Sequence, residues 1–253
     1  MSGDAPPRAT FIGDAMASVV QAIVEVEQTS GRPAVVVGGL AVLCRLSHAH
    51  RATVDLDVVD RGDQSEPLLE LLRQAPGSTA VLPEAVMLPT AFGDVRVDVL
   101  TVRQVELDDP STDPGDRLHA SSHAWAHQTA SRVSIVVHSI AGPPVAVTAA
   151  VAEPGPLIAM KLQAVMDRGE VKRGTDLQDV LRLVLDEVQR PLLLNQLTSI
   201  DAAMAADVAA HVRLWLVKHR ADALRWMRQT GTDDITLDDV DLVAELLLNA
   251  TRR

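Results

Sequence analysis

The stretch GGLAVLCRLSHAHRATVDLDVVD, residues 38–60, places a Gly-Gly pair before an apolar segment and two carboxylates among valines and leucines. Residues 54–59 have the β-branched composition of a buried strand. Side chains at positions i and i+2 of a strand point to the same face. Asp55 and Asp57 should therefore lie side by side, with the intervening apolar residues packed on the opposite face.

Two like charges this close repel each other, and near a core they are costly unless a cation joins them. Carboxylate oxygens suit Mg²⁺, or Mn²⁺ as an alternative, which completes its shell with waters and substrate phosphates. Gly38 and Gly39 follow a short β-branched run and open an expected helix. Their missing side chains let a phosphate approach the backbone at a helix N-terminus, which favours negative charge. The stretch thus predicts a metal-assisted phosphate site.

A third acid fits the same site. In GDVRVDVL, residues 93–100, the valines alternate with Asp94, Arg96 and Asp98, which predicts a strand with one apolar and one polar face. If this strand neighbours the first, Asp98 reaches the metal site and can act as a base toward an attacking hydroxyl. The hydroxyl would attack the α-phosphorus of a nucleoside triphosphate.

Two residues just before the acids are further candidates for nucleotide binding. Arg51 lies four residues before Asp55, a position from which a phosphate contact is expected. Thr53 shares a strand face with Asp55 and should border the site.

Lys161 is the candidate cation of the second half of the chain. It falls in the middle of the apolar face of a helix expected over residues 157–168, with Arg168 beside it. A cation centred on an apolar face is costly unless it meets an anion, and a triphosphate would be that anion. The alternative is a lysine that extends along the edge of the face into solvent.

Asp176 and Asp179 are expected in the first turn of a helix over residues 176–187. Acids there stabilise a helix simply through its dipole. The residues alone leave open whether either acid is functional, and which of the two.

The chain changes character near EPGP, residues 153–156. Before it the pattern is mixed α/β, and after it every periodic segment is helical, which predicts an α/β domain over residues 1–155 and an all-α domain over 156–253. Strands are expected at 33–37, 54–59, 92–100, 134–140 and 145–151. Helices are expected at 15–28, 40–46, 66–74, 119–128, 157–168, 176–187, 202–219, 221–229 and 237–249, with a loop over 101–115.

Composition limits the possible partners. The 253 residues have a formal net charge of −11, and the chain contains no Tyr, two Phe and three Trp, which disfavours a protein that coats nucleic acid. No apolar run approaches the ~20 residues that span a bilayer. The N-terminal MSGDAPPRAT does not resemble a secretory signal, and Cys44 has no second cysteine to pair with. A cytoplasmic protein without a membrane partner is expected.

These motifs, in this order, resemble the DNA polymerase β-like nucleotidyltransferase superfamily, whose core pattern is a Gly-Gly pair, a short helix and DxD. RATVDLDVV further resembles the branch that contains the AbiEii abortive-infection toxins and the related MenT-type mycobacterial toxins. That branch shows K-L-x-A, a basic stretch and D-x-x-D, which match Lys161 to Ala164, Lys172-Arg173 and Asp176 to Asp179. The resemblance spans roughly residues 33–185, and it departs at Thr175, where many members have a basic residue.

The resemblance implies a bilobed, Mg²⁺-dependent nucleotidyltransferase that uses an NTP. It further implies the toxin of a toxin–antitoxin pair, with a cognate antitoxin encoded nearby and the 3′ end of tRNA as the acceptor. The alternatives are a small-molecule, aminoglycoside-like nucleotidyltransferase and a non-catalytic nucleotide-binding regulator. Any contact with RNA is expected at the basic residues of the late helices, which are Arg213, Lys218, Arg220, Arg225 and Arg228.

Overall fold

The computed structural model describes residues 5–62 and 66–253. Residues 1–4, which begin the N-terminal stretch considered above, lie outside the described residues. The chain forms two compact units, one of residues 1–104 with 124–153 and the other of residues 105–123 with 154–253. Each unit has its own core.

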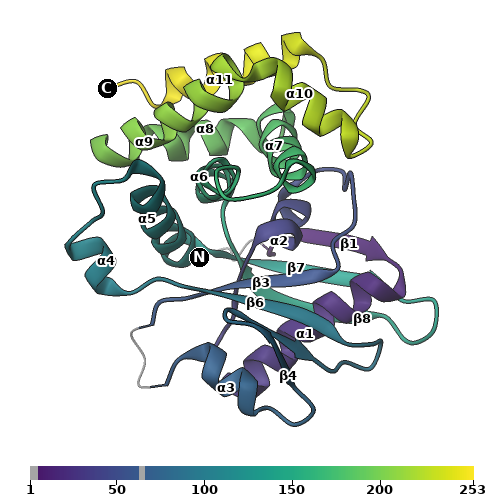
Figure 1. The fold of residues 1–253 in the computed structure, drawn as a ribbon. Helices are drawn as coiled ribbons and strands as arrows, with labels where there is room; N and C mark the ends of the chain where they lie inside the picture. Colours follow the sequence, from purple (N-terminus) through teal and green to yellow (C-terminus); the bar gives the residue numbers. More distant parts are fainter. Residues whose placement is uncertain (1–4, 63–65) are drawn as a thin grey trace. The chain divides into compact units, whose positions relative to one another are not determined.

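The first unit is built on a mixed sheet. Among the described residues eight strands form it, in the order β1-β7-β8-β2-β3-β6-β5-β4 (Figure 1). The pairs β1–β7, β2–β8 and β3–β6 are parallel, and the others are antiparallel. The strands are β1 (Arg8–Ile12), β2 (Val35–Val37), β3 (Asp55–Asp60), β4 (Thr79–Leu82), β5 (Ala85–Leu88), β6 (Val95–Thr101), β7 (Ser131–His138) and β8 (Val145–Val151).

The centre of this sheet is apolar because its strands are rich in valine. All three residues of β2 are buried, and so are Leu56 and Val58 of β3 and the valines of β6. Helix α1 (Asp14–Ser30) contacts β3, β6, β7 and β8. Figure 1 draws α1 and α3 (Leu68–Gln74) below the strands and α2 (Gly38–Arg45) above them. The sheet therefore has helices on both faces, and α2 begins directly after β2.

The expected α/β class of this unit is confirmed, and most of its strands lie where the sequence predicts them. Strands β1, β4 and β5 were not expected from the pattern. All four residues of β4 are exposed, so its sequence TAVL has no alternation between buried and solvent-facing positions. The loop expected over residues 101–115 contains a short helix, α4 (Gln104–Asp108).

The second unit is helical, as expected. Helix α6 (Pro154–Ala164) lies at its centre, is buried from Pro154 to Gln163 and contacts α7, α8 and α9. In the described part of the chain no helix has the length and apolarity needed to cross a membrane. The other helices from α5 onward are α5 (Pro114–Thr129), α7 (Glu170–Leu185), α8 (Arg190–Thr198), α9 (Ala202–Val212), the π-helix η1 (Arg213–Lys218), α10 (Arg220–Gln229) and α11 (Leu237–Ala250).

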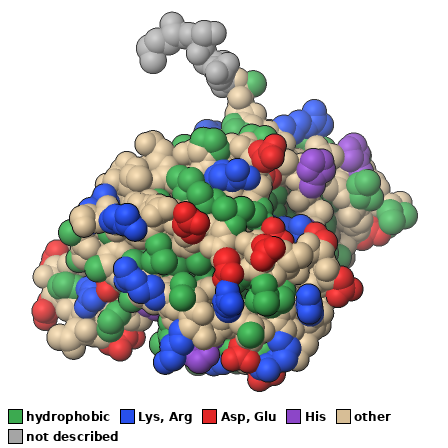
Figure 2. All heavy atoms as spheres, turned by 90° about the horizontal axis from the view of Figure 1, so that it is seen from above, with side chains coloured by type: hydrophobic (Ala, Val, Ile, Leu, Met, Phe, Trp, Pro, Cys, Tyr) green, Lys and Arg blue, Asp and Glu red, His purple; other side chains and the backbone are tan. Residues whose placement is uncertain are grey.

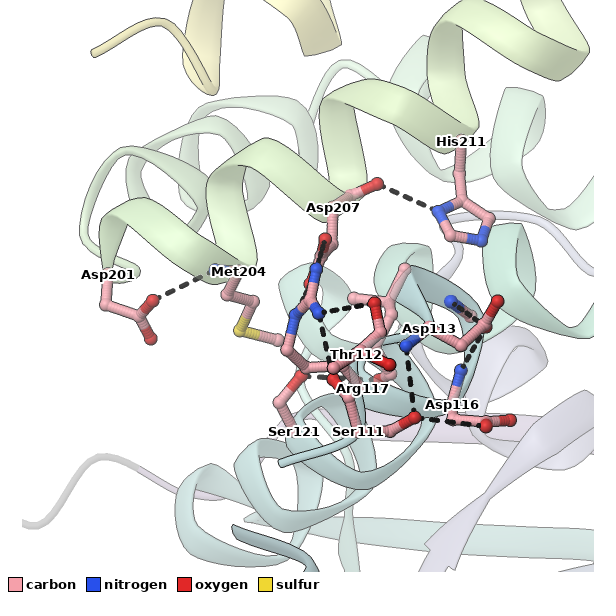
Figure 3. Close-up of polar contacts among 12 residues, drawn as sticks. Ser111, Thr112, Asp113, Asp116, Arg117, Ser121, Asp201, Met204, Asp207 and His211 are labelled. Atoms are coloured by element: carbon pink, nitrogen blue, oxygen red, sulfur yellow. Dashed lines mark hydrogen bonds and ion pairs between the residues drawn. The ribbon is translucent and has the colours of Figure 1, made fainter. Parts of the chain in front are cut away.

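Residues 105–123 belong to the helical unit, although the sequence-based boundary near residue 155 groups them with the sheet. Arg117 explains the grouping: its Nε and Nη2 donate to Asp207 Oδ2 and Oδ1 on α9 at 2.7 and 2.6 Å (Figure 3). Its Nη1 also donates to the carbonyl of Ser111. A bidentate pair of this kind fixes both partners in orientation. Arg117 therefore attaches the segment to α9, which the local sequence pattern does not reveal.

Several predicted helices have different bounds in the structure, and α8 was not expected from the pattern. The helix expected over residues 157–168 is α6, which ends at Ala164 and does not include Arg168. The helix expected over residues 202–219 is α9 followed by η1, and α7 begins at Glu170 rather than at residue 176. Gly174 lies in the part of α7 that precedes the expected start. A Cβ on Gly174 would lie 2.3 Å from the carbonyl oxygen of Trp226, so this glycine permits the close approach of α10 and does not end a helix. Asp176 and Asp179 consequently lie inside α7 and not in its first turn.

Candidate functional site

The three strand acids of the sheet lie on one face. Parallel pairing of β3 with β6 places Asp57 opposite Asp98 and Asp55 opposite Arg96. The acids are partly exposed, whereas the residues that alternate with them are buried. The neighbouring position of β6, on which the predicted role of Asp98 depends, is therefore present. We call Asp55, Asp57, Asp98 and Arg96 the acid face.

Gly38 lies directly against one of these acids. Its φ of +63° belongs to the left-handed region, and an added Cβ would lie 1.9 Å from Asp57 Oδ2. Only glycine fits both the backbone conformation and the close approach. The first residue of α2 and the second acid of DxD are thus in contact, and the absence of a side chain at Gly38 is what lets the carboxylate of Asp57 lie against this backbone.

Gly39, Arg51 and Thr53 surround the same place. A Cβ on Gly39 would lie 2.9 Å from Arg51 Nη2 and 3.0 Å from Thr53 Oγ1. The hydroxyl of Thr53 donates to Asp55 Oδ1 at 2.8 Å, which orients that carboxylate. The structure therefore gathers Gly38, Gly39, Arg51 and Thr53 around Asp55 and Asp57. Their predicted part in nucleotide binding remains a prediction.

Arg96 engages the third acid. Its Nη2 and Nε lie 2.6 and 3.1 Å from Asp98 Oδ1. The hydrogen bond to Asp98 is the largest effect and raises the pKa of Arg96; burial opposes it, and the charges of Asp98, Asp55 and Asp57 raise the pKa further. Arg96 lies on the polar face of the strand, as the alternation predicts, but no role for it was expected from the sequence. Its spacing of two from Asp98 is the signal that predicts the contact.

The donor set of the acid face fits Mg²⁺ in part. Mg²⁺ is commonly held by one or two carboxylates together with substrate phosphates and waters, and Asp55 and Asp57 supply two such carboxylates beside a glycine-lined backbone. Within residues 5–62 and 66–253 no group of three or more His, Cys, Asp or Glu side chains is arranged to hold a metal. Asp98 is paired with Arg96 in this structure, which is consistent with that finding.

A second charged cluster lies in the helical unit. Lys161 Nζ on α6 is 2.7 Å from Asp176 Oδ1 and 2.9 Å from Asp179 Oδ2, both on α7. Arg168 Nη1 is 3.0 Å from Asp176 Oδ2. The side chains of Lys161, Asp176 and Asp179 are 8%, 1% and 0% exposed. We call these four residues the Lys161 cluster.

The anions beside Lys161 are two carboxylates of the chain itself, whereas the sequence pattern led us to expect a triphosphate there. Burial alone would lower the pKa of Lys161, but Asp176 and Asp179 outweigh it and raise the pKa above its ordinary value. Lys161 is thus a charged, buried group and does not extend along the edge of the helix into solvent. Whether Lys161, Arg168, Asp176 or Asp179 also serves a nucleotide remains a prediction.

Sequence reasoning missed an aromatic cluster at the π-helix. The guanidinium carbon of Arg173 lies 5.8 Å from the ring centre of Trp215 and 5.4 Å from that of Trp226. The two indole rings are 6.2 Å apart in an edge-to-face arrangement. Cation–π contacts and edge-to-face pairs are both stabilising. Trp215 and Trp226 are eleven residues apart on different helices, so no local pattern indicates their contact.

The five basic residues of the late helices are exposed. Arg220 pairs with Asp241, and Arg225 Nη2 lies 2.9 Å from Asp222 Oδ1. In the view of Figure 2, acidic and basic side chains are interspersed over the visible face. Carboxylates therefore accompany part of the basic surface that was expected to meet RNA.

Neither a protein-family model nor a curated protein sequence matches the chain. Among solved structures, the chain is similar to the crystal structure of an antigenic nucleotidyltransferase-like protein from Paracoccidioides brasiliensis, at 17% sequence identity. The match covers 76% of this chain and 92% of that chain, with a TM-score of 0.39. A likeness at this TM-score supports no functional conclusion, so the functional case rests on the side chains of the acid face.

Proposed function

We propose that the protein is a nucleotidyltransferase that moves a nucleoside monophosphate from an NTP to an acceptor hydroxyl. The observation that supports this most is the contact of Gly38 with Asp57 on a face that also holds Asp55 and Asp98. A glycine at the start of a helix gives phosphate access to backbone N–H groups, and the adjacent carboxylates suit a phosphate-bound divalent cation. The motif resemblance and the geometry thus favour the same chemistry.

In this proposal Asp55 and Asp57 hold Mg²⁺ or Mn²⁺, which supplies charge neutralisation to the triphosphate. Thr53 fixes the orientation of Asp55 through its hydroxyl. The backbone at Gly38 and Gly39 and the guanidinium of Arg51 bind phosphate oxygens. The acceptor oxygen forms a bond to the α-phosphorus, the bond to the β-phosphate oxygen breaks, and pyrophosphate leaves. Asp98 accepts the proton of the hydroxyl.

The acceptor that the motif resemblance favours is the 3′ end of tRNA, which makes the protein the toxin of a toxin–antitoxin pair. A small cationic acceptor of the aminoglycoside kind is the second candidate, since it suits the net charge of −11. The basic residues of the helical unit should favour binding of the anionic tRNA, whereas they should disfavour binding of a cationic aminoglycoside.

The direct test is incubation of the purified protein with total tRNA or with an aminoglycoside, each with one labelled NTP and Mg²⁺. Label in tRNA that depends on metal and is lost in Asp55→Asn supports the proposal. If label appears in the aminoglycoside alone, the second candidate replaces the first. If neither acceptor is labelled with any NTP, the transfer proposal is rejected for both.

A double variant tests whether the basic residues of the late helices contact RNA. Arg213→Glu with Arg228→Glu reverses two exposed charges, and we expect it to impair tRNA labelling while leaving NTP binding unchanged. Because few phosphate contacts are involved, tRNA labelling should decline only modestly as salt rises. The slope of log K against log salt concentration is about −0.9 per phosphate contact on a duplex. Unchanged tRNA labelling in the double variant would show that these residues do not meet the acceptor.

A further inference from the structure

Arg96 introduces a positive charge among the carboxylates that are proposed to hold a metal. It lies on β6 opposite Asp55 and two residues from Asp98, on the same strand face. Two of its nitrogens contact one oxygen, Asp98 Oδ1, at 2.6 and 3.1 Å. A charge-assisted contact with two N–H groups on one oxygen is among the stronger hydrogen-bonded arrangements. The oxygen that faces Arg96 is thus occupied.

The remaining acids also act on Arg96. The pairing of β3 with β6 places Asp55 opposite Arg96 and Asp57 opposite Asp98, so the guanidinium shares one strand face with all three carboxylates. The three carboxylates outnumber Arg96 on this strand face, and Arg51 lies nearby at Gly39. A divalent cation would therefore meet a more negative face if Arg96 were absent than it meets with Arg96 present.

We propose that Arg96 is a built-in counter-cation that occupies Asp98 until a divalent metal binds, and that it thereby sets the affinity of the acid face for metal. The proposal rests on the proposed function, because it takes the acid face to be a metal site. It deepens that function by giving one residue control over when Asp98 becomes available.

The different exposure of Arg96 and Asp98 suits the replacement of Arg96 by a metal ion. The side chain of Arg96 is 35% exposed and that of Asp98 is 14% exposed. The guanidinium can therefore leave Asp98 for solvent without opening the core, whereas the carboxylate stays on the sheet. While Arg96 holds Asp98, the pair neutralises one of three crowded acids and so limits their mutual repulsion.

The test is direct binding of Mn²⁺, without NTP or acceptor, measured by electron paramagnetic resonance. A single nearby charge changes the proton affinity of a carboxylate by about 10- to 1,000-fold, so we expect Arg96→Gln to bind Mn²⁺ at least about tenfold more tightly than the parent. Arg96→Lys keeps the charge and should remain closer to the parent than Arg96→Gln. Arg132→Gln, which removes an exposed arginine from β7 of the same sheet, should leave the affinity unchanged.

The outcomes separate this inference from the function on which it rests. If parent and Arg96→Gln bind Mn²⁺ with equal affinity, or the variant binds it more weakly, the metal site stands and the role of Arg96 is overturned. A Lys variant that binds as tightly as the Gln variant overturns it as well, because charge would not be the cause. If neither parent nor variant binds Mn²⁺, the metal site itself fails, and both proposals fail with it.

Discussion

The acid face and the Lys161 cluster both combine carboxylates with basic side chains, but they differ in burial and in charge balance. On the acid face three carboxylates meet one guanidinium, and all four side chains are partly exposed. In the Lys161 cluster two carboxylates meet a lysine and an arginine, and the three central side chains are almost fully buried. One cluster has an excess of negative charge, and the other is balanced.

The difference indicates which cluster needs a partner from outside. Buried charges are tolerated when they are paired, and the partner of Lys161 is already supplied by α7. Crowded carboxylates that remain partly exposed are stabilised when a further cation joins them. We therefore expect substitutions in the Lys161 cluster to act first on folding, and substitutions on the acid face to act first on ligand binding.

The largest expected effect on folding is that of Lys161→Met. It removes the buried cation that both Asp176 and Asp179 contact, and breaking a buried pair in this way typically costs about 3–5 kcal/mol. Urea unfolding followed by circular dichroism should show this loss. The control is Lys172→Met on the exposed surface of α7, which should leave the free energy of unfolding close to that of the parent. Equal stability of the two variants would remove the contrast between the clusters.

Asp57→Asn should show the opposite behaviour. We expect nucleotide transfer to fall by at least about 100-fold, because even residues behind a metal ligand cost 10- to 100-fold when changed. The free energy of unfolding should be unchanged or slightly raised, since one of three like charges is removed. Labelling kinetics and urea unfolding on the same preparation test both parts. Asp94→Asn, at an exposed position just before β6, serves as the control, and transfer close to that of the parent in Asp57→Asn would contradict the metal assignment.

The smallest expected effect concerns a buried group that is uncharged. Burial, and then the charge of His119, lowers the pKa of His123 to about 3, well below the ordinary value near 6.5. As pH falls below 6.5 the unfolded chain binds a proton that folded His123 does not, so stability is lost between about pH 6.5 and pH 3. From pH 7 to pH 5 this amounts to about 2 kcal/mol.

Unfolding of His123→Gln by urea at pH 7 and pH 5 tests this sign. The variant should lose about 2 kcal/mol less than the parent over that interval, whatever its absolute stability at pH 7. Parallel losses in both proteins would mean that His123 takes up its proton in the folded state.

The sequence predicts the local parts of the acid face well. Strand alternation suffices to place Asp55 and Asp57 together and to put Arg96 and Asp98 on one face, because these relations span two residues. The pairing of β3 with β6 joins residues about forty positions apart. Alternation within a strand does not indicate which strand lies beside it in the sheet. Periodicity likewise fails for β4, which is exposed along its whole length.

The helical unit shows a different limit. The apolar face around Lys161 predicts that the lysine needs an anion, and the structure contains one. The expected triphosphate is replaced by Asp176 and Asp179, because α7 packs against α6 and begins as early as Glu170, which the local pattern does not reveal. Gly174 permits the close contact of α7 with α10 by its lack of a side chain, a relation between distant helices that the local pattern does not reveal.

The aromatic cluster at the π-helix has a practical consequence for spectroscopy. The chain has no Tyr and three Trp, and Trp215 and Trp226 both lie in the helical unit beside the guanidinium of Arg173. Intrinsic fluorescence excited in the indole band therefore reports mainly on that unit, whereas the sheet contributes to the far-ultraviolet circular dichroism. Fluorescence thus follows mainly the helical unit, whereas circular dichroism follows the secondary structure of both units, and a separation of the two midpoints in one titration would show that the units do not unfold together.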